Sequence, residues 1–240
     1  MRAALAAMAG TAAVAAYLPA VASIDPLRRA LTPRVLPDAL SGIGRRGHIA
    51  LTFDDGPDPA STPAFLDLLA RHDRRATFFL LGEHVAANAG LVEEMAAAGH
   101  ELAVHGWDHT CTAWKRPGAL ADEIRRARDL VEAVGDRPVR WYRPPYGVLT
   151  TETLVAARAA DLDTVLWSAW GRDWEAGATG IRIAHTVRRQ LRDGGTVLLH
   201  DTDRTSAPGS WWRTLAATEA LLDEWSAARF DVGPLSEHPA

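Results

Sequence analysis

The sequence is poor in cysteine and lysine, and it carries no excess of positive charge. Cys111 is the only cysteine in 240 residues, so no disulfide can form within the chain. We expect this side chain to be a small buried apolar group. Lys115 is the only lysine, and the formal net charge is -4. Because no basic field is present to hold phosphates, the chain is not expected to bind nucleic acid.

Charged side chains are also absent from residues 3–24. This alanine-rich stretch follows Arg2, is long enough to span a bilayer, and contains Ala20–Ala22, which resembles a signal-peptidase site. Three arginines follow it by residue 34, which is the wrong charge asymmetry for an uncleaved anchor whose C-terminus lies outside. We expect residues 1–24 to be a signal peptide or membrane anchor of an exported, cell-envelope protein. The alternative is an alanine-rich helix packed on the domain.

After a connector at residues 25–47, short apolar or β-branched runs alternate with longer segments of helical spacing. No linker interrupts this pattern, so residues 48–235 are expected to form one domain. The predicted strands are Ile49–Phe53, Ala76–Leu80, Glu101–Val104, Val139–Tyr142, Thr164–Trp167, Thr196–Leu199 and Phe230–Val232. The predicted helices are Pro63–Arg71, Leu91–Ala98, Leu120–Val134, Thr151–Ala160, Ile181–Leu191 and Trp211–Ala227. This alternation predicts a parallel sheet wrapped by helices.

Several helix boundaries carry their own start and stop signals. Serine, threonine and proline suit the first residues of a helix, and glycine suits the left-handed residue that follows the last turn. The residues concerned are Ser61 or Thr62 before Pro63, Thr150 or Thr151, Gly99 and Gly135.

Ionisable side chains follow five of the predicted strands. In chain order these groups are Asp54–Pro57, His105 with His109, Arg143–Gly147, Asp173 with Trp174, and His200 with Asp201. In a barrel of parallel strands, functional groups drawn from many strands gather at the carboxyl ends of those strands. The distribution therefore favours an α/β barrel of seven strand–helix units over an open doubly wound sheet.

Each of these groups has an ordinary structural explanation when taken alone, such as a polar turn for Asp54 and Asp55. Together they suit metal-assisted hydrolysis. Two imidazoles and one carboxylate form a mixed nitrogen and oxygen site with room for water and substrate. Of two neighbouring carboxylates in a tight turn, one can bind the metal while the other takes a proton from water. A separate histidine, His200, could return a proton to the leaving group.

At this point the chain resembles the polysaccharide deacetylases with a NodB-like domain, carbohydrate esterase family four. The similarity runs from about His48 to Val232. It rests on five ordered motifs: TFDDGP at Thr52–Pro57, HGWDH at His105–His109, RPPYG at Arg143–Gly147, RDW at Arg172–Trp174 and VLLHD at Val197–Asp201. The resemblance implies a distorted (β/α)7 barrel with outer helices. It also implies removal of N-acetyl groups from an N-acetylglucosamine-containing polysaccharide of the envelope, by a protein expected to be a monomer.

The resemblance also implies a divalent metal and its ligands. Asp55, His105 and His109 would bind the ion, expected to be Zn2+ with Co2+ or Mn2+ as alternatives. One departure from the family pattern lies beside these ligands, because Gly106 stands where serine or threonine usually follows the first metal histidine. Either the metal affinity is lower for this reason, or Asp108 or Thr110 braces the loop instead.

The remaining roles follow from the same resemblance. Asp54 would be the general base, held in place by Arg143. His200 would be the general acid, oriented by Asp173. The backbone N–H of Tyr146 would stabilise the oxyanion. The apolar slot for the acetyl methyl group would be formed by Trp174 and Leu198.

Three other interpretations remain open from the sequence. Two histidines and a carboxylate also suit a ferrous oxygenase, although such sites normally sit on double-stranded β-sheets. A non-catalytic envelope protein could keep the barrel to bind glycan. An O-acetyl ester hydrolase acting on acetylated xylan would use the same acetyl pocket.

Overall fold

The computed structural model describes residue 40 and residues 42–238, so the predictions for residues 1–24 and for most of the connector lie outside the described residues. The strands are β1 His48–Asp54, β2 Thr77–Leu81, β3 Glu101–Gly106, β4 Trp141–Tyr142, β5 Asp163–Thr164, β6 Ala169–Trp170, β7 Thr196–His200 and β8 Asp231–Gly233. The helices are α4 Thr62–Arg71, α5 Gly82–Ala87, α6 Ala89–Ala97, α7 Pro117–Gly135, α8 Thr151–Ala159, α9 Gly180–Gln190 and α10 Ser210–Ala227. Among the described residues, no helix combines the length and apolarity needed to cross a bilayer.

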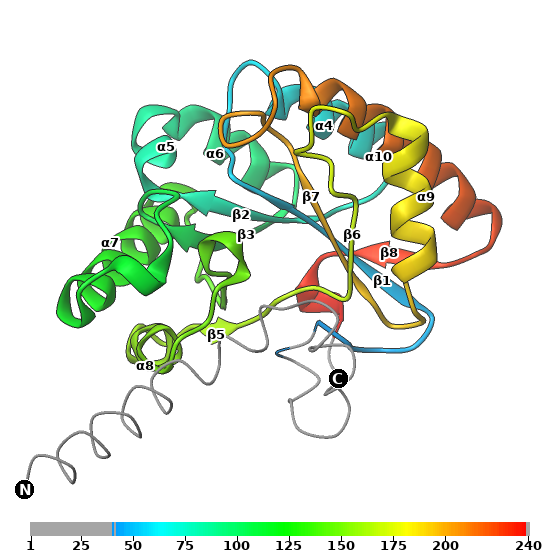
Figure 1. The fold of residues 1–240 in the computed structure, drawn as a ribbon. Coiled ribbons are helices and arrows are strands. Elements are labelled where there is room, and N and C mark those ends of the chain that lie inside the picture. Colours follow the sequence, from blue (N-terminus) through cyan, green and yellow to red (C-terminus); the bar gives the residue numbers. More distant parts are fainter. Residues whose placement is uncertain (1–39, 41, 239–240) are drawn as a thin grey trace, which may run out of the picture.

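The strands form one sheet in the order β5-β4-β3-β2-β1-β7-β6, and every pairing is parallel (Figure 1). β1 lies at the centre, and all seven of its residues are buried. Its first half pairs with β8 and its second half with β2, while β7 runs along its other edge. Strands covered on both faces read as near-continuous apolar runs, which is why these segments were recognisable in the sequence.

The helices pack on the outer face of the curved sheet (Figure 1). Near β2 and β3, α5 and α6 pack against α7, which also contacts α8, and near β7, α10 packs against α9 and α4. β5 and β6 follow one another in the chain but lie at opposite ends of the sheet. The sheet therefore curls into an open half-barrel, which confirms the predicted distorted barrel of parallel strands with outer helices.

The predicted strand Thr164–Trp167 is wrong in detail, because the chain crosses the open side of the barrel there. β5 ends at Thr164, and β6 begins only at Ala169. Between them, the N–H of Leu166 donates to the carbonyl of Leu40 rather than to a neighbouring strand. This gap leaves the carbonyl groups of Val165 and Leu166 free to accept hydrogen bonds from the side chain of Arg143.

The core next to β1 is aromatic. Phe53, Phe65 and Phe78 are fully buried, and the ring centroid of Phe53 lies 5.1 Å from the centroid of each of the other two rings. This packing fixes the end of β1 just before the paired aspartates. Cys111 lies in the loop between β3 and α7 and is only partly buried, so the prediction of a buried side chain is wrong.

Three of the predicted helix boundaries are confirmed, and one differs. Thr150 forms a capping box with Thr153 at the start of α8, and Gly99 adopts a left-handed φ of 82° after α6. At the end of α7 the left-handed residue is Asp136 with φ 49°, not Gly135, because the helix runs one residue further than predicted. Ser61 is the N-cap residue of α4 and proline lies in the first turn, as predicted, although the Ser61 side chain makes no cap hydrogen bond.

His100 makes the stability of this core dependent on pH. His100 is buried, and its Nδ1 accepts a hydrogen bond from the N–H of Ala76 at 3.3 Å. An accepting Nδ1 carries no proton, so the folded state holds the ring in its neutral form. Burial, followed by the charge of Arg75, lowers the pKa of His100 to about 4. In the unfolded chain His100 is protonated as the pH falls through about 6.5, whereas in the folded chain it is protonated only near pH 4. The unfolded state is therefore favoured as the pH falls between these two values.

We expect His100→Asn to lose less stability on acidification than the wild type. The asparagine oxygen can replace Nδ1 as an acceptor and does not titrate. Between pH 8 and pH 5 the loss in free energy of unfolding should be about 2 kcal/mol smaller in the variant. Urea unfolding of the metal-free protein at both pH values measures this difference. Equal losses in the two proteins would show that His100 is not the group responsible.

Candidate functional site

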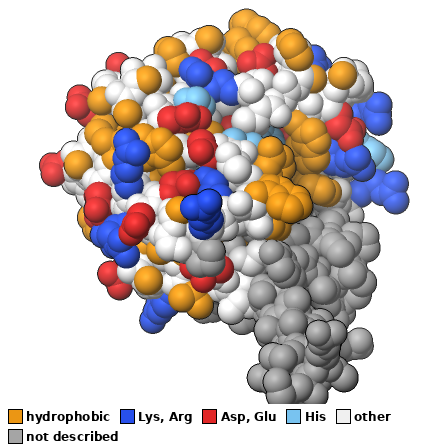
Figure 2. Space-filling view, turned by 60° about the vertical axis from the view of Figure 1, so that its left-hand side comes forward, with side chains coloured by type: hydrophobic (Ala, Val, Ile, Leu, Met, Phe, Trp, Pro, Cys, Tyr) orange, Lys and Arg blue, Asp and Glu red, His pale blue; other side chains and the backbone are white. Residues whose placement is uncertain are grey.

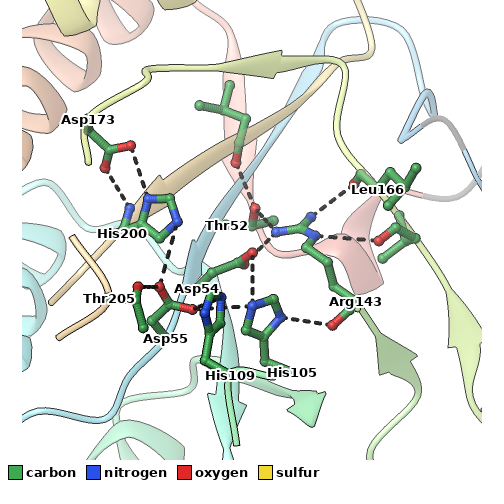
Figure 3. Close-up of polar contacts among 12 residues, drawn as sticks. Thr52, Asp54, Asp55, His105, His109, Arg143, Leu166, Asp173, His200 and Thr205 are labelled. Atoms are coloured by element: carbon green, nitrogen blue, oxygen red, sulfur yellow. Dashed lines mark hydrogen bonds and ion pairs between the residues drawn. The ribbon is translucent and has the colours of Figure 1, made fainter. Parts of the chain in front are cut away.

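A cavity of about 250 Å³ opens at the carboxyl ends of the strands. It brings together eight of the ten residues predicted for the site, namely Asp54, Asp55, His105, His109, Tyr146, Trp174, Leu198 and His200. The other two, Arg143 and Asp173, are fully buried behind the wall and are hydrogen-bonded to Asp54 and His200. Figure 3 shows the ionisable members of this set converging from β1, β3, β7 and the loops that follow the strands, namely Asp54, Asp55, His105, His109, Arg143, Asp173 and His200.

Asp54 and Asp55 present their carboxylates to different neighbours. Asp54 is the last residue of β1, whereas Asp55 adopts a left-handed backbone with φ 78°. Asp55 is completely buried, and its Oδ1 lies 3.2 Å from Nε2 of His105 and 3.3 Å from Nε2 of His109. Burial alone would raise the pKa of Asp55, but the nearby imidazoles of His105, His200 and His109 hold it well below its ordinary value. The carboxylate is therefore ionised.

The three groups fit a divalent cation. The Nδ1 of His105 lies 2.8 Å from the carbonyl oxygen of Arg143, which can only accept, so Nδ1 carries a proton and Nε2 is the nitrogen left to bind an ion. This Nε2 faces Asp55 Oδ1, a buried oxygen with no hydrogen-bond donor among the described residues. Burial lowers the pKa of His109 to about 4, so its ring is neutral at pH 7. Three acceptor atoms within 4.8 Å of one another call for a positive ion between them.

Asp54 is held by a fully buried arginine. The Nη1 of Arg143 donates to Asp54 Oδ1 at 2.7 Å and to the hydroxyl of Thr52 at 2.8 Å. Its other nitrogens donate to the carbonyls of Val165 and Leu166, which the break between β5 and β6 leaves free of strand pairing (Figure 3). The guanidinium is thus satisfied on several sides, and Asp54 Oδ2 is left facing the cavity 3.9 Å from His105 Nε2.

His200 stands across the cavity with its own carboxylate partner. Asp173 is fully buried, and it accepts from the backbone N–H of His200 at 2.8 Å and lies 3.0 Å from His200 Nδ1. The hydroxyl of Thr214 also donates to Asp173 at 3.0 Å. Burial alone would lower the pKa of His200, but Asp173 and then Asp55 raise it to about 10. The ring therefore carries a proton at neutral pH, with Nε2 turned toward Asp55 at 3.8 Å.

An aromatic and aliphatic wall closes the cavity on one side. Leu198 is buried in a cluster with Leu166 and Trp167. The rings of Trp167, Trp170 and Trp174 follow one another with centroid distances of 5.7 Å and 5.0 Å. Trp174 then meets the His200 ring edge to face at 5.6 Å. This wall is of a size and polarity to hold a small apolar group beside the metal-binding residues.

The loop that carries His109 is braced by the single lysine. Gly106 adopts φ 118°, a conformation that serine or threonine rarely adopts. In place of a hydroxyl there, Lys115 donates to Asp108 at 2.7 Å and to Glu123 on α7. The ion triad ties the loop to a long helix, so the departure from the family pattern is compensated through Asp108, one of the two neighbours that the sequence suggested.

Five residues that line the cavity were not predicted: Gly147, Trp167, Trp170, Thr205 and Ser206. Gly147 is part of a quoted motif, and its left-handed backbone, φ 65°, brings it against Trp167. Trp167 and Trp170 lie just before the RDW motif, and their position beside this motif is the sequence feature that could have identified them as part of the site. Thr205 and Ser206 lie in a loop with no recognisable pattern.

Comparison with known proteins agrees with this geometry. The sequence profile of the family described as polysaccharide deacetylase matches residues 42–165. A chitooligosaccharide deacetylase of Bradyrhizobium sp. (strain ANU 289) is 34% identical over 200 residues, which cover 79% of this chain and 89% of that protein. The crystal structure of the Bc1960 peptidoglycan N-acetylglucosamine deacetylase superposes with a TM-score of 0.76 at 26% identity, covering 83% of this chain and 91% of the other.

A third similar structure is a mutant of BA3943, described as a CE4 family pseudoenzyme with restored enzymatic activity. It has a TM-score of 0.74 and 26% identity, and the alignment covers 85% of this chain and 72% of that one. Fold similarity alone therefore does not establish catalysis, and the residues at the site have to be judged directly.

Proposed function

The chain belongs to the polysaccharide deacetylase family, and on that premise we propose that it removes N-acetyl groups from an N-acetylglucosamine-containing polysaccharide of the cell envelope. One observation carries the proposal. A carboxylate, Asp54, and a protonated histidine, His200, flank a cluster of three acceptor atoms that suits a cation. This is the arrangement that amide hydrolysis requires, since water is a poor nucleophile and an amine is a poor leaving group.

We assign the metal-binding role to Asp55, His105 and His109, with Zn2+ as the ion. The mixed imidazole and carboxylate set is typical of catalytic zinc, which keeps positions open for water and substrate. When bound, the ion supplies a Lewis acid that polarises the acetyl carbonyl.

The chain's own residues supply the proton transfers. Asp54 takes a proton from water through Oδ2, while Arg143 holds Oδ1 and keeps the carboxylate aimed at the cavity. As the water oxygen bonds to the acetyl carbon, the carbonyl oxygen gains negative charge, and the backbone N–H of Tyr146 donates to it. His200 then gives its Nε2 proton to the amide nitrogen, and the carbon–nitrogen bond breaks to leave acetate and a free amine. Asp173 keeps the His200 ring oriented.

The proposed acetyl pocket uses Trp174 and Leu198, with Trp167 and Trp170 extending the same apolar wall. The proposed sugar-polymer substrate rests on the related deacetylases. A nucleic acid is not expected, because the net charge is -4 and acidic and basic side chains are interspersed on the face shown in Figure 2. The envelope location rests on the uncharged segment at residues 3–24 and on the substrate named for the peptidoglycan deacetylase.

Acetate release from a panel of polymers tests the proposal. We expect Zn2+-loaded protein to release acetate from chitin oligomers or peptidoglycan, to lose this activity on treatment with a chelator, and to regain it with Zn2+. Release from acetylated xylan alone would instead indicate an O-acetyl esterase. Glycan binding with Zn2+ bound but no acetate released from any polymer would indicate a non-catalytic protein.

A further inference from the structure

The two oxygens of the Asp55 carboxylate have different surroundings. Oδ1 faces the imidazoles of His105 and His109 and receives no hydrogen bond from the described residues. Oδ2 accepts a hydrogen bond from the hydroxyl of Thr205 (Figure 3). A hydroxyl has a single proton to donate, so Thr205 hydrogen-bonds to Oδ2 alone, and Oδ1 remains available to bind the ion.

Thr205 comes from the loop of residues 201–209, which is fastened to the loop that carries Asp55. Asp58, three residues after Asp55, is the point of attachment. Its Oδ2 accepts from the Thr202 hydroxyl at 2.8 Å and lies 2.9 Å from Nε of Arg204. The backbone N–H of Arg204 donates in turn to the Thr202 hydroxyl at 3.2 Å.

The far end of the same loop is fixed separately. The N–H of Gly209 donates to Asp203 at 2.5 Å, and the N–H of Ala207 donates to the carbonyl of Trp174 at 3.0 Å. The segment between these ties, which contains Thr205, is therefore held on both sides over the metal-binding residues.

We propose that Thr205 is a positioning residue that makes Asp55 a one-oxygen ligand, and that the bonds of Thr202 and Arg204 to Asp58 hold it there. The inference rests on the proposed metal site. Without the Thr205 hydroxyl, Oδ2 would lose its hydrogen-bond donor and keep only the more distant Nε2 of His200 at 3.8 Å, so the carboxylate would be freer to turn away from His105 and His109. Groups that hydrogen-bond to metal ligands in this way typically contribute about 10- to 100-fold to metal affinity.

The test is the affinity of the whole chain for Zn2+, measured by competition with a chromophoric chelator and independent of catalysis. We expect Thr205→Val to bind Zn2+ about 10- to 100-fold more weakly than the wild type. Thr205→Ser, which keeps the hydroxyl, should restore the affinity. Thr186→Val is the matched control, because it makes the same chemical change on α9, outside the cavity, where the Thr186 hydroxyl donates to the carbonyl of Arg182 at 2.7 Å, and it should leave Zn2+ affinity unchanged.

The absorption spectrum of the Co2+-loaded protein adds a readout that a purely structural role would not change. Thr205→Val should shift the Co2+ bands as Asp55 changes its mode of binding, whereas Thr205→Ser should keep the wild-type spectrum. Unchanged affinity and spectrum in Thr205→Val would overturn the inference. So would a Thr205→Ser variant as weak as Thr205→Val, since the methyl group would then be the important part. A wild type that binds no Zn2+ would count against the proposed function itself.

Arg204→Gln tests the attachment and replaces Thr205→Val if that variant fails to fold. It removes a partly exposed ion pair with Asp58 and leaves Thr205 intact. We expect Zn2+ affinity to fall about twofold to fivefold, in line with the modest energies of such pairs. Unchanged Zn2+ affinity in both Arg204→Gln and Asp58→Asn would overturn the proposed fastening.

Discussion

Asp54→Asn is expected to reduce acetate release from N-acetylated polymer by about 10²- to 10⁴-fold while Zn2+ remains bound. Asparagine has the shape of aspartate and can still accept a hydrogen bond from Arg143, but its amide cannot take a proton from water. The metal-binding residues are unchanged, because Asp54 contributes no atom to the Asp55, His105 and His109 cluster. The measurement is kcat/KM on chitin oligomers, with the Zn2+ content of each preparation determined alongside.

The same substitution should also lower stability. Arg143 is fully buried, and Asp54 is the only carboxylate that the described residues place against its guanidinium. Removing one charge of a buried pair typically costs about 3–5 kcal/mol, although the carbonyls of Val165 and Leu166 soften this loss. Rates must therefore be compared at a temperature where unfolding curves show the variant to be folded.

Asp122→Asn is a suitable control, because it makes the same chemical change on the exposed face of α7, where Asp122 pairs only with Arg125 in the described structure. We expect wild-type kcat/KM from it. An Asp54→Asn variant that is folded, loaded with Zn2+ and fully active would rule out Asp54 as the base. The proton would then have to pass to another group on the cavity wall.

The sequence predicted which side chains meet in the cavity better than it predicted how the strands that carry them pair. Asp54, Asp55, His105, Arg143 and His200 each follow or end a recognisable apolar strand, and parallel strands bring such positions to one edge. The types of these residues and their order along the chain were sufficient for this prediction. No knowledge of how the strands pair was needed to expect these side chains in one cavity.

What the sequence did not predict depends on pairing between distant segments. The split at Leu166 arises because Arg143 and Leu40, far away in the chain, bind the backbone where a continuous strand was expected. The contact of Thr205 with Asp55 could not be predicted, because Asp55 lies 150 residues earlier and the loop between His200 and α10 has no hydrophobic periodicity. Gly135 was wrongly predicted to be the left-handed residue that ends α7, because Asp136 also tolerates this conformation.

The role of His200 leads to a prediction that depends on the leaving group. His200→Gln should lower kcat/KM on an N-acetylated sugar by about 10²- to 10⁴-fold, because the amine leaves only when protonated. On 4-nitrophenyl acetate the departing phenolate is stable without a proton, so the same variant should lose little activity. Both measurements use the same acetyl pocket and the same Zn2+-loaded protein. His185→Gln, an exposed histidine on α9, serves as the control and should behave as wild type on both substrates.

The pH dependence should separate the two substrates in the same way. The pKa of His200 is raised to about 10, so its imidazolium form is present at neutral pH and is lost as the pH rises through that value. Wild-type activity on the amide should therefore decline on the alkaline side, and the decline should be absent with 4-nitrophenyl acetate and in His200→Gln. If the variant lost both activities equally, His200 would be needed for binding or for metal placement rather than for protonating the amine. A wild-type rate on the amide that rises steadily with pH would lead to the same conclusion, because a group that acts by donating a proton cannot become more effective as it loses it.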